Sequence, residues 1–141
     1  MNIYLDTSGL VKLLVQEDGS ETMVRVWDEA DFIFAGVLAY PEARAALATG
    51  ERGRRLSEAE HHRAKRILAR RWDEIQVVQL DGPLAVQAGD LSERYGLRAY
   101  DAVHLACALA LAGTGAVLAT WDRELHQAAR WAGLSVIPAA I

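Results

Sequence analysis

Four acidic residues lie beside short apolar segments, at positions where alternating strands and helices would bring them together. They are Asp6, Glu42, Asp101 and Asp122. Asp6, for example, directly follows the apolar run Ile3 to Leu5. Carboxylates that share a poorly solvated pocket repel one another, so either their pKa values rise or a cation neutralises them. The sequence therefore predicts a divalent metal site with carboxylate ligands.

The chemistry of these ligands narrows the choice of ion. Hard oxygen ligands favour Mg²⁺ or Mn²⁺ over zinc, and Mg²⁺ usually takes one or two carboxylates together with water and the phosphate oxygens of a substrate. An ion held in this way activates water and neutralises phosphate, and a pair of ions stabilises the attacking and leaving oxygens of an in-line displacement. The acidic residues are compatible with one ion or with two.

Short apolar segments, rich in β-branched and aromatic residues, alternate with longer segments of helical spacing. The expected strands are Ile3 to Leu5, Phe32 to Phe34, Val77 to Leu80, Val117 to Ala119 and Ser135 to Ile137. The expected helices are Gly9 to Val15, Glu21 to Ala30, Pro41 to Ala48, Ser57 to Trp72, Leu84 to Tyr95, Ala102 to Leu111 and Arg123 to Ala132. This alternation predicts an α/β fold whose mostly parallel sheet is covered by helices on both faces.

Chain order alone places three of the acids at one edge of this sheet. Ligands of such sheets bind beyond the carboxyl ends of the strands, where loops and helix starts converge. Asp6 and Asp122 follow expected strands, and Glu42 lies within about a helical turn of another. Asp101 instead opens an apolar helix, so its approach to the other acids requires a tertiary contact.

Length and composition favour one intracellular domain. The chain has 141 residues, enough for a single domain with its own core over residues 1–141. Cys107 is the only cysteine, which excludes an internal disulfide, and the amino terminus has no basic leader. We expect a cytoplasmic protein. The uncharged segment Ala102 to Trp121 is interrupted by Gly113 and Gly115, so we expect a buried helix, turn and strand there and no membrane span.

Four motifs occur in order along nearly the whole chain. They are Leu5-Asp6-Thr7-Ser8, Pro41-Glu42-x-Arg44, Tyr100-Asp101-Ala102-x-His104-x-Ala106 and Thr120-x-Asp122. This ordered set resembles the PIN-domain family of metal-dependent nucleases, and more narrowly the VapC-type toxins of bacterial toxin–antitoxin pairs. The resemblance implies a three-layer α/β/α sandwich, a Mg²⁺ or Mn²⁺ dependent endoribonuclease, a homodimer and inhibition by a small cognate antitoxin.

The resemblance also implies roles for individual residues. Asp6 and Asp101 would be the core metal ligands, and Glu42 and Asp122 would complete the site directly or through water. The supporting hydroxyls would come from Thr7, Ser8 and Thr120. Attack by metal-activated water, in place of the ribose hydroxyl, would leave a 5′ phosphate and a 3′ hydroxyl on the cleaved RNA.

Each of these residues has a structural interpretation as well. Taken singly, Asp6, Asp101 and Asp122 are possible helix caps, and Ser8 is another. His104 lies one helical turn after Asp101 in an apolar helix, and we interpret it as a hydrogen-bonded core histidine that takes no part in catalysis. A shared acidic site accounts for the four acids jointly better than four independent caps do.

RNA binding requires basic residues, although the net charge is −4 and the pI is near 5.5. Eight of the fifteen Lys and Arg residues fall between positions 52 and 71. From this segment we predict RNA contacts for Arg52, Arg54, Arg55, Arg63 and Arg66. The alternative is a solvated helix face paired to Glu58 and Glu60.

Two other functions compete with the ribonuclease. A non-catalytic RNA-binding or interaction module would keep the fold without the chemistry. An aspartyl-nucleophile phosphatase would use Asp6 after the first strand, but its usual second acid is absent because position 8 is Ser.

Overall fold

Five parallel strands form one sheet at the centre of the computed structural model, which describes residues 1–141. The strands are β1 (Asn2–Leu5), β2 (Phe32–Gly36), β3 (Gln76–Val78), β4 (Val117–Ala119) and β5 (Val136–Ile137). Their order across the sheet is β3-β2-β1-β4-β5, so β1 is central. Residues Ile3 to Leu5 are fully buried, because helices cover both faces of this strand.

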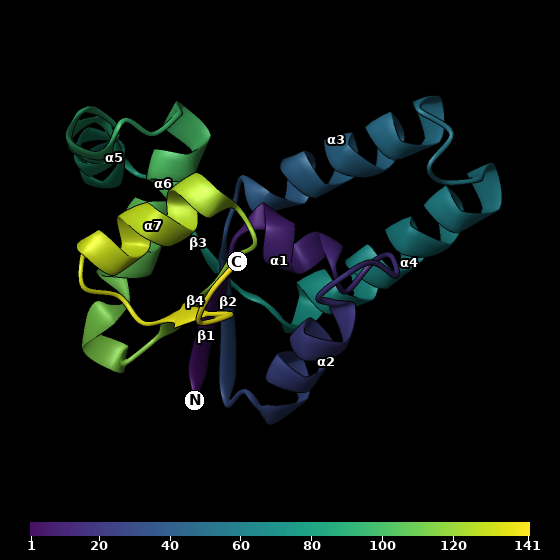
Figure 1. The fold of residues 1–141 in the computed structure, drawn as a ribbon, viewed down its shortest axis with the longest axis horizontal. Helices are drawn as coiled ribbons and strands as arrows, with labels where there is room; N and C mark the ends of the chain where they lie inside the picture. Colours follow the sequence, from purple (N-terminus) through teal and green to yellow (C-terminus); the bar gives the residue numbers. More distant parts are fainter.

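Helices cover the sheet in two layers (Figure 1). One layer contains α1 (Thr7–Val11), α2 (Ser20–Glu29), α3 (Ala39–Arg52) and α4 (Glu58–Glu74); the other contains α5 (Gly82–Tyr95), α6 (Ala99–Ala110) and α7 (Arg123–Trp131). A short 3₁₀ helix, η1 (Ala112–Thr114), precedes β4. The predicted three-layer α/β/α sandwich with a parallel sheet is confirmed.

Alternation along β1 divides the core into two apolar clusters. Ile3 and Leu5 pack with buried side chains from α1 to α4. Tyr4 points to the opposite face and packs with buried side chains of α5, α6 and α7, together with Leu118 of β4. Successive side chains of a strand point to opposite faces, so one short strand supports both layers.

Polar residues, a proline and a glycine define the ends of α4 and α5. Ser57 caps α4 in a reciprocal capping box with Glu60. Asp81 caps α5, Pro83 lies in its first turn, and Gly96 ends it in the left-handed conformation that glycine adopts without strain.

Several predicted element boundaries were wrong. The third helix was expected at Pro41 to Ala48, but α3 runs from Ala39 to Arg52. The first helix was expected at Gly9 to Val15, but α1 begins at Thr7 and ends at Val11, because polar contacts hold the following residues in a loop. In that loop the Lys12 ammonium lies 2.9 Å from the Glu17 carboxylate. The third strand ends at Val78 and does not reach Leu80, which is exposed shortly before the α5 cap.

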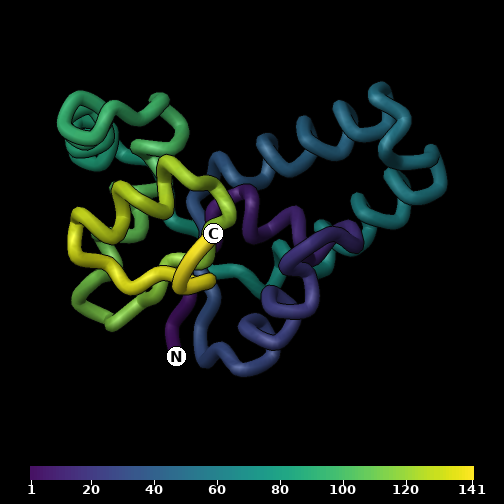
Figure 2. The backbone as a smooth tube through the Cα atoms, in the orientation of Figure 1, coloured from purple at the N-terminus to yellow at the C-terminus, as the bar shows by residue number.

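Helices α3 and α4 form an antiparallel pair that extends away from the sheet (Figure 1, Figure 2). Their contact buries Leu47 of α3 and Ala64 and Leu68 of α4. The turn between them closes on the Gly50 carbonyl, which accepts hydrogen bonds from the backbone N–H groups of Arg55 and Leu56 at 2.9 and 3.1 Å. The pair thus carries many basic residues outward from the sheet.

The uncharged segment Ala102 to Trp121 forms most of α6, then η1 and β4, as predicted. None of the helices combines the length and apolar character needed to cross a bilayer.

Gly9 permits the close approach of α1 to β4. A Cβ atom at this position would lie 2.9 Å from the backbone oxygen of Ala119, which cannot rotate away as a side chain could. We expect Gly9→Ala to lower the free energy of unfolding by about 1–3 kcal/mol in urea denaturation.

Gly89→Ala is the control, because no atom lies within 4 Å of its Cβ position in α5. That variant should gain about 0.5–1 kcal/mol from helix propensity. Unchanged stability of Gly9→Ala would show that α1 moves away from β4 without cost.

Candidate active site

The carboxyl ends of β1, β2 and β4 lie at one edge of the sheet, where α1, α3 and α7 begin (Figure 1). Asp6 is the N-cap of α1, and Asp122 is the N-cap of α7. Glu42 lies in the first turn of α3. The local fold therefore delivers three carboxylates to one edge, each at the start of a helix.

Asp6 is buried, and both of its carboxylate oxygens accept hydrogen bonds. Oδ1 accepts from the Gly9 backbone N–H at 2.8 Å and from Ser8 Oγ at 2.7 Å, and Oδ2 accepts from Thr120 Oγ1 at 2.7 Å. Burial raises the pKa of Asp6, although the hydrogen bonds from Thr120, Gly9 and Ser8 oppose the rise. The carboxylate is thus rigidly held in a place that disfavours an uncompensated negative charge.

The two predicted supporting hydroxyls near Asp6 connect it to the α7 start. Thr120 Oγ1 also accepts a hydrogen bond from the Asp122 backbone N–H at 3.1 Å. Ser8 Oγ accepts from the Trp121 backbone N–H at 2.8 Å. Ser8 does not cap α1, because Asp6 does so. Asp6 and Asp122 are therefore helix caps and members of the acidic edge at once.

Asp101, in the first turn of α6, is the carboxylate whose charge is least compensated. Its Oδ2 atom is buried and accepts no hydrogen bond. The Arg98 Nε lies 3.5 Å away, within ion-pair distance but without hydrogen-bond geometry. Burial raises the pKa of Asp101 to about 6, the charges of Asp122 and Asp6 add to the rise, and Arg98 opposes it. Asp101 does not cap its helix, and its surroundings join it electrostatically to the other acids.

Glu42 is bound by two side chains from other elements. Its Oε1 atom accepts hydrogen bonds from Thr7 Oγ1 at 3.0 Å and from His104 Nε2 at 2.8 Å. His104 is buried and hydrogen-bonded, as predicted, but sequence reasoning missed that its partner is Glu42. The sequence did indicate that His104 lies near the acids, because it is one turn after Asp101 on the same helix face.

The donor atoms at this edge suit a hard divalent cation. All four acids offer carboxylate oxygens, and a buried oxygen that accepts no hydrogen bond, such as Oδ2 of Asp101, is the kind of atom that a bound ion explains. No three His, Cys, Asp and Glu side chains lie close enough together here to hold a metal ion. The complete ligand set therefore stays a prediction.

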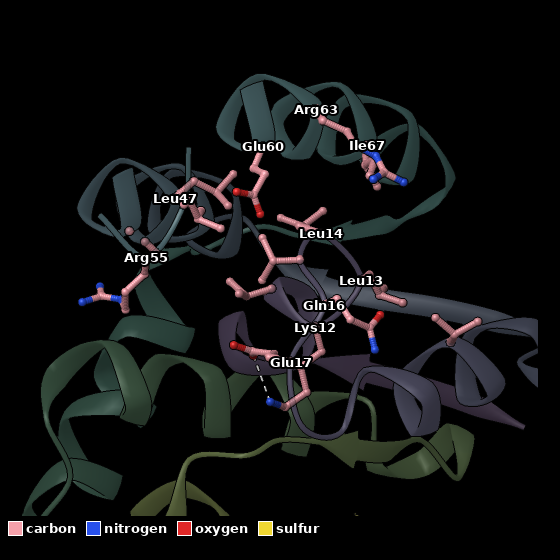
Figure 3. Close-up of a pocket in the computed structure, with 16 residues that line it drawn as sticks. Lys12, Leu13, Leu14, Gln16, Glu17, Leu47, Arg55, Glu60, Arg63 and Ile67 are labelled. Atoms are coloured by element: carbon pink, nitrogen blue, oxygen red, sulfur yellow. Dashed lines mark hydrogen bonds and ion pairs between the residues drawn. The ribbon is translucent and has the colours of Figure 1, made fainter. Parts of the chain in front are cut away.

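The predicted RNA-binding arginines lie on the α3–α4 pair. Arg52 and Arg54 are at its outer turn, away from the acidic edge (Figure 1). Arg55 and Arg63 line a cleft of about 650 Å³ whose walls include Leu14, Leu47 and Ile67 (Figure 3). None of the four acids lines this cleft, so these arginines would contact RNA at a distance from the carboxylates.

Arg63 and Arg66 are exposed and form no ion pair. Of the two glutamates considered as their partners, Glu58 pairs with His62 and Glu60 is used in the helix cap with Ser57. The structure therefore does not support a helix face in which these two arginines are neutralised by neighbours.

Residues 3–130 match the PIN domain family. The chain belongs to that family. It is 43% identical over 139 residues to Ribonuclease VapC49 of Mycobacterium tuberculosis, and the alignment covers 99% of this chain and 96% of VapC49. The VapC resemblance seen in the motifs is thus confirmed across almost the whole sequence.

Solved structures of toxins share the fold at low sequence identity. A toxin–antitoxin complex from Klebsiella pneumoniae superposes with a TM-score of 0.63 at 16% identity, covering 99% of this chain and 95% of that one. VapC20 of Mycobacterium tuberculosis, a toxin that cleaves the sarcin-ricin loop, superposes with a TM-score of 0.66 at 18% identity, covering 89% and 94%.

The raised pKa of Asp101 should make the free energy of unfolding depend on pH. Because its folded pKa, about 6, exceeds the ordinary value of 3.8, this group contributes stability below about pH 4 that is lost as the pH rises through about 6. In the presence of a chelator near pH 8, the free energy of unfolding of Asp101→Asn should exceed that of wild type by about 1–2 kcal/mol. A pKa shift of one unit corresponds to about 1.4 kcal/mol, and solvent screening reduces the effect.

The gain should disappear near pH 4, where the wild-type carboxyl is protonated in the folded state. Urea denaturation at the two pH values measures it. Asp90→Asn, an exposed change in α5, is the control and should be neutral at both. An equal gain for Asp101→Asn at both pH values would contradict the electrostatic origin.

Proposed function

We propose that this PIN-domain chain is a metal-dependent endoribonuclease, the toxin of a toxin–antitoxin pair, folded as one domain over residues 1–141. The observation that carries the proposal is the buried Asp101 oxygen that accepts no hydrogen bond, in a carboxylate that experiences the charges of Asp122 and Asp6. The near full-length similarity to a VapC ribonuclease supports the reaction class.

In this proposal Asp6 and Asp101 hold Mg²⁺ or Mn²⁺, and Glu42 and Asp122 complete the site directly or through water. The oxygen donors favour these ions over softer metals. When bound, the ion supplies charge neutralisation for the phosphodiester and a lowered pKa for an attacking water. Asp6 and Asp101 are buried, which disfavours their negative charges, so a bound cation would stabilise both carboxylates.

The protein's own groups prepare this site before any ion or RNA arrives. Ser8, Thr120 and the Gly9 N–H together donate three hydrogen bonds to Asp6, which leaves one lone pair of the carboxylate for a ligand. Arg98, which is largely exposed, partly neutralises Asp101 and is placed to contact a phosphate once another cation takes over that task. Little reorganisation is then needed at the moment of reaction.

The partners follow from the same assignment. The Klebsiella pneumoniae neighbour is a toxin–antitoxin complex, which supports a small cognate antitoxin for this chain as well. We also propose a homodimer and an RNA substrate. The phosphatase alternative is disfavoured, because Ser8 donates a hydrogen bond to Asp6 and no acid occupies its position.

Removing either core carboxylate should abolish cleavage. We expect Asp6→Asn and Asp101→Asn each to lower the RNA cleavage rate by at least about 100-fold with Mn²⁺ or Mg²⁺, and a chelator to have the same effect on wild type. Purified protein with cellular RNA measures this, and sequencing of the fragments should find 5′ phosphates. Expression of either variant should no longer arrest growth.

Asp90→Asn is the matched control and should cleave like wild type. Fragments that end in a 2′,3′-cyclic phosphate would contradict hydrolysis by activated water. Binding of RNA without any metal-dependent cleavage by wild type would favour the non-catalytic RNA-binding module.

The basic face of α4 should contribute to RNA affinity. We expect the double variant Arg63→Glu, Arg66→Glu to bind RNA more weakly and to reduce the slope of affinity against salt by roughly 1 for each phosphate that the protein no longer neutralises. Fluorescence anisotropy over a salt series measures both quantities. Arg25→Glu, Arg130→Glu carries the same change in net charge on α2 and α7 and is the control. If both double variants weakened RNA binding equally, the effect would come from net charge alone, and a specific role for Arg63 and Arg66 would be contradicted.

A further inference from the structure

Tyr4 and His104 form a buried polar pair inside the apolar cluster of α5, α6 and α7. Tyr4 is completely buried and His104 is 2% exposed. The Tyr4 Oη and His104 Nδ1 atoms are 2.9 Å apart. Buried polar groups are costly unless their hydrogen bonds are satisfied, so the direction of each bond in this pair matters.

The backbone of β2 determines what the tyrosine hydroxyl donates to. The Gly36 N–H donates to Tyr4 Oη at 3.0 Å, so the hydroxyl is an acceptor on that side. A Cβ atom at Gly36 would lie 2.8 Å from Oη, which explains why only glycine allows this approach. Burial raises the pKa of Tyr4 well above its ordinary value, so the hydroxyl keeps its hydrogen. Two side chains meet the hydroxyl on its other sides, His104 at 2.9 Å and the Cys107 thiol. A thiol sulfur is a weak acceptor, so the hydrogen points to His104 Nδ1.

A histidine that accepts at Nδ1 carries its hydrogen at Nε2. His104 Nε2 lies 2.8 Å from Glu42 Oε1, and a carboxylate oxygen can only accept. Nε2 also lies 3.2 Å from Thr7 Oγ1, whose hydroxyl donates to the same Oε1 atom at 3.0 Å. The hydrogen bonds thus run in one direction from Gly36 through Tyr4 and His104 to Glu42.

This arrangement treats the two oxygens of Glu42 differently. Oε1 accepts from Thr7 and His104, whereas Oε2 accepts no hydrogen bond within the protein. The Glu42 side chain is 27% exposed, so the free oxygen is accessible to a ligand. Histidines and hydroxyls that orient a carboxylate in this manner commonly support a metal site from behind its ligands.

We propose that Tyr4 and His104 are positioning residues that fix the Glu42 carboxylate with Oε1 held by the protein and Oε2 presented to a divalent cation or its water. This inference rests on the proposed function. His104 touches neither RNA nor the reacting atoms in this account and acts only through Glu42.

Substituting His104 by Asn or by Gln distinguishes a positioning role from a purely structural one, because the two amide side chains differ in length. The terminal amide nitrogen of Gln at position 104 reaches about as far as Nε2, whereas that of Asn reaches only about as far as Nδ1. We expect His104→Asn to weaken Mn²⁺ binding about 10-fold or more in calorimetry of the RNA-free protein, and His104→Gln to restore most of the loss. The kcat of His104→Asn should fall while the KM for RNA is unchanged.

A double-mutant cycle with Glu42→Gln tests the route of the effect. If His104 acts only through Glu42, His104→Asn should cause no further loss of Mn²⁺ affinity in the Glu42→Gln background. Additive losses, or Mn²⁺ binding by folded His104→Asn equal to that of wild type, would overturn the positioning role. Failure of wild type to bind Mn²⁺ would instead count against the proposed function, which keeps the two failures distinct.

The direction of the hydrogen bonds can be tested even if substitutions at His104 prevent folding. Nitrogen–proton NMR of the imidazole ring should find the Nε2–H tautomer in wild type. Tyr4→Phe, which keeps the ring and removes the hydroxyl, should abolish that selection and weaken Mn²⁺ binding. An Nδ1–H tautomer in wild type would overturn the proposal directly.

Discussion

Repulsion among dehydrated carboxylates at the carboxyl edge of the sheet is the constraint on which the rest of the site depends. Asp6 and Asp101 are buried, and burial raises the pKa of each. Asp101 also experiences the charges of Asp122 and Asp6. A fold that buries such groups must compensate them with hydrogen bonds or charges, or leave them ready for a cation. This protein does the first for Asp6 and only partly for Asp101.

Helix starts provide much of the compensation. Asp6 and Asp122 accept hydrogen bonds from the first turns of α1 and α7, where the backbone offers unpaired N–H groups. The same carboxylates therefore stabilise the local fold and form the acidic edge. Capping and metal binding were alternatives for each residue taken singly, and the structure confirms capping for Asp6 and Asp122 while it places both at the acidic edge.

The sheet core and the acidic edge are connected through β1. Its alternation places Ile3 and Leu5 in one apolar cluster and Tyr4 in the other. Tyr4 is the member of the second cluster that carries a polar group, and it contacts His104 of α6. A polar contact inside an apolar layer specifies how α6 lies on the sheet, and Asp101 lies in the first turn of that helix. Packing of this layer and the geometry of the edge are thus coupled.

The sequence by itself determined the alternation of strands and helices, the parallel sheet and the common edge of Asp6, Glu42 and Asp122, because the carboxyl ends of parallel strands meet on one side. Only the tertiary structure decided the place of Asp101 and the bond from His104 to Glu42. Both residues lie on α6, whose position depends on how side chains from distant segments pack over the sheet. The early end of α1 was also missed, because helical periodicity does not encode the loop that follows, in which Lys12 lies at ion-pair distance from Glu17.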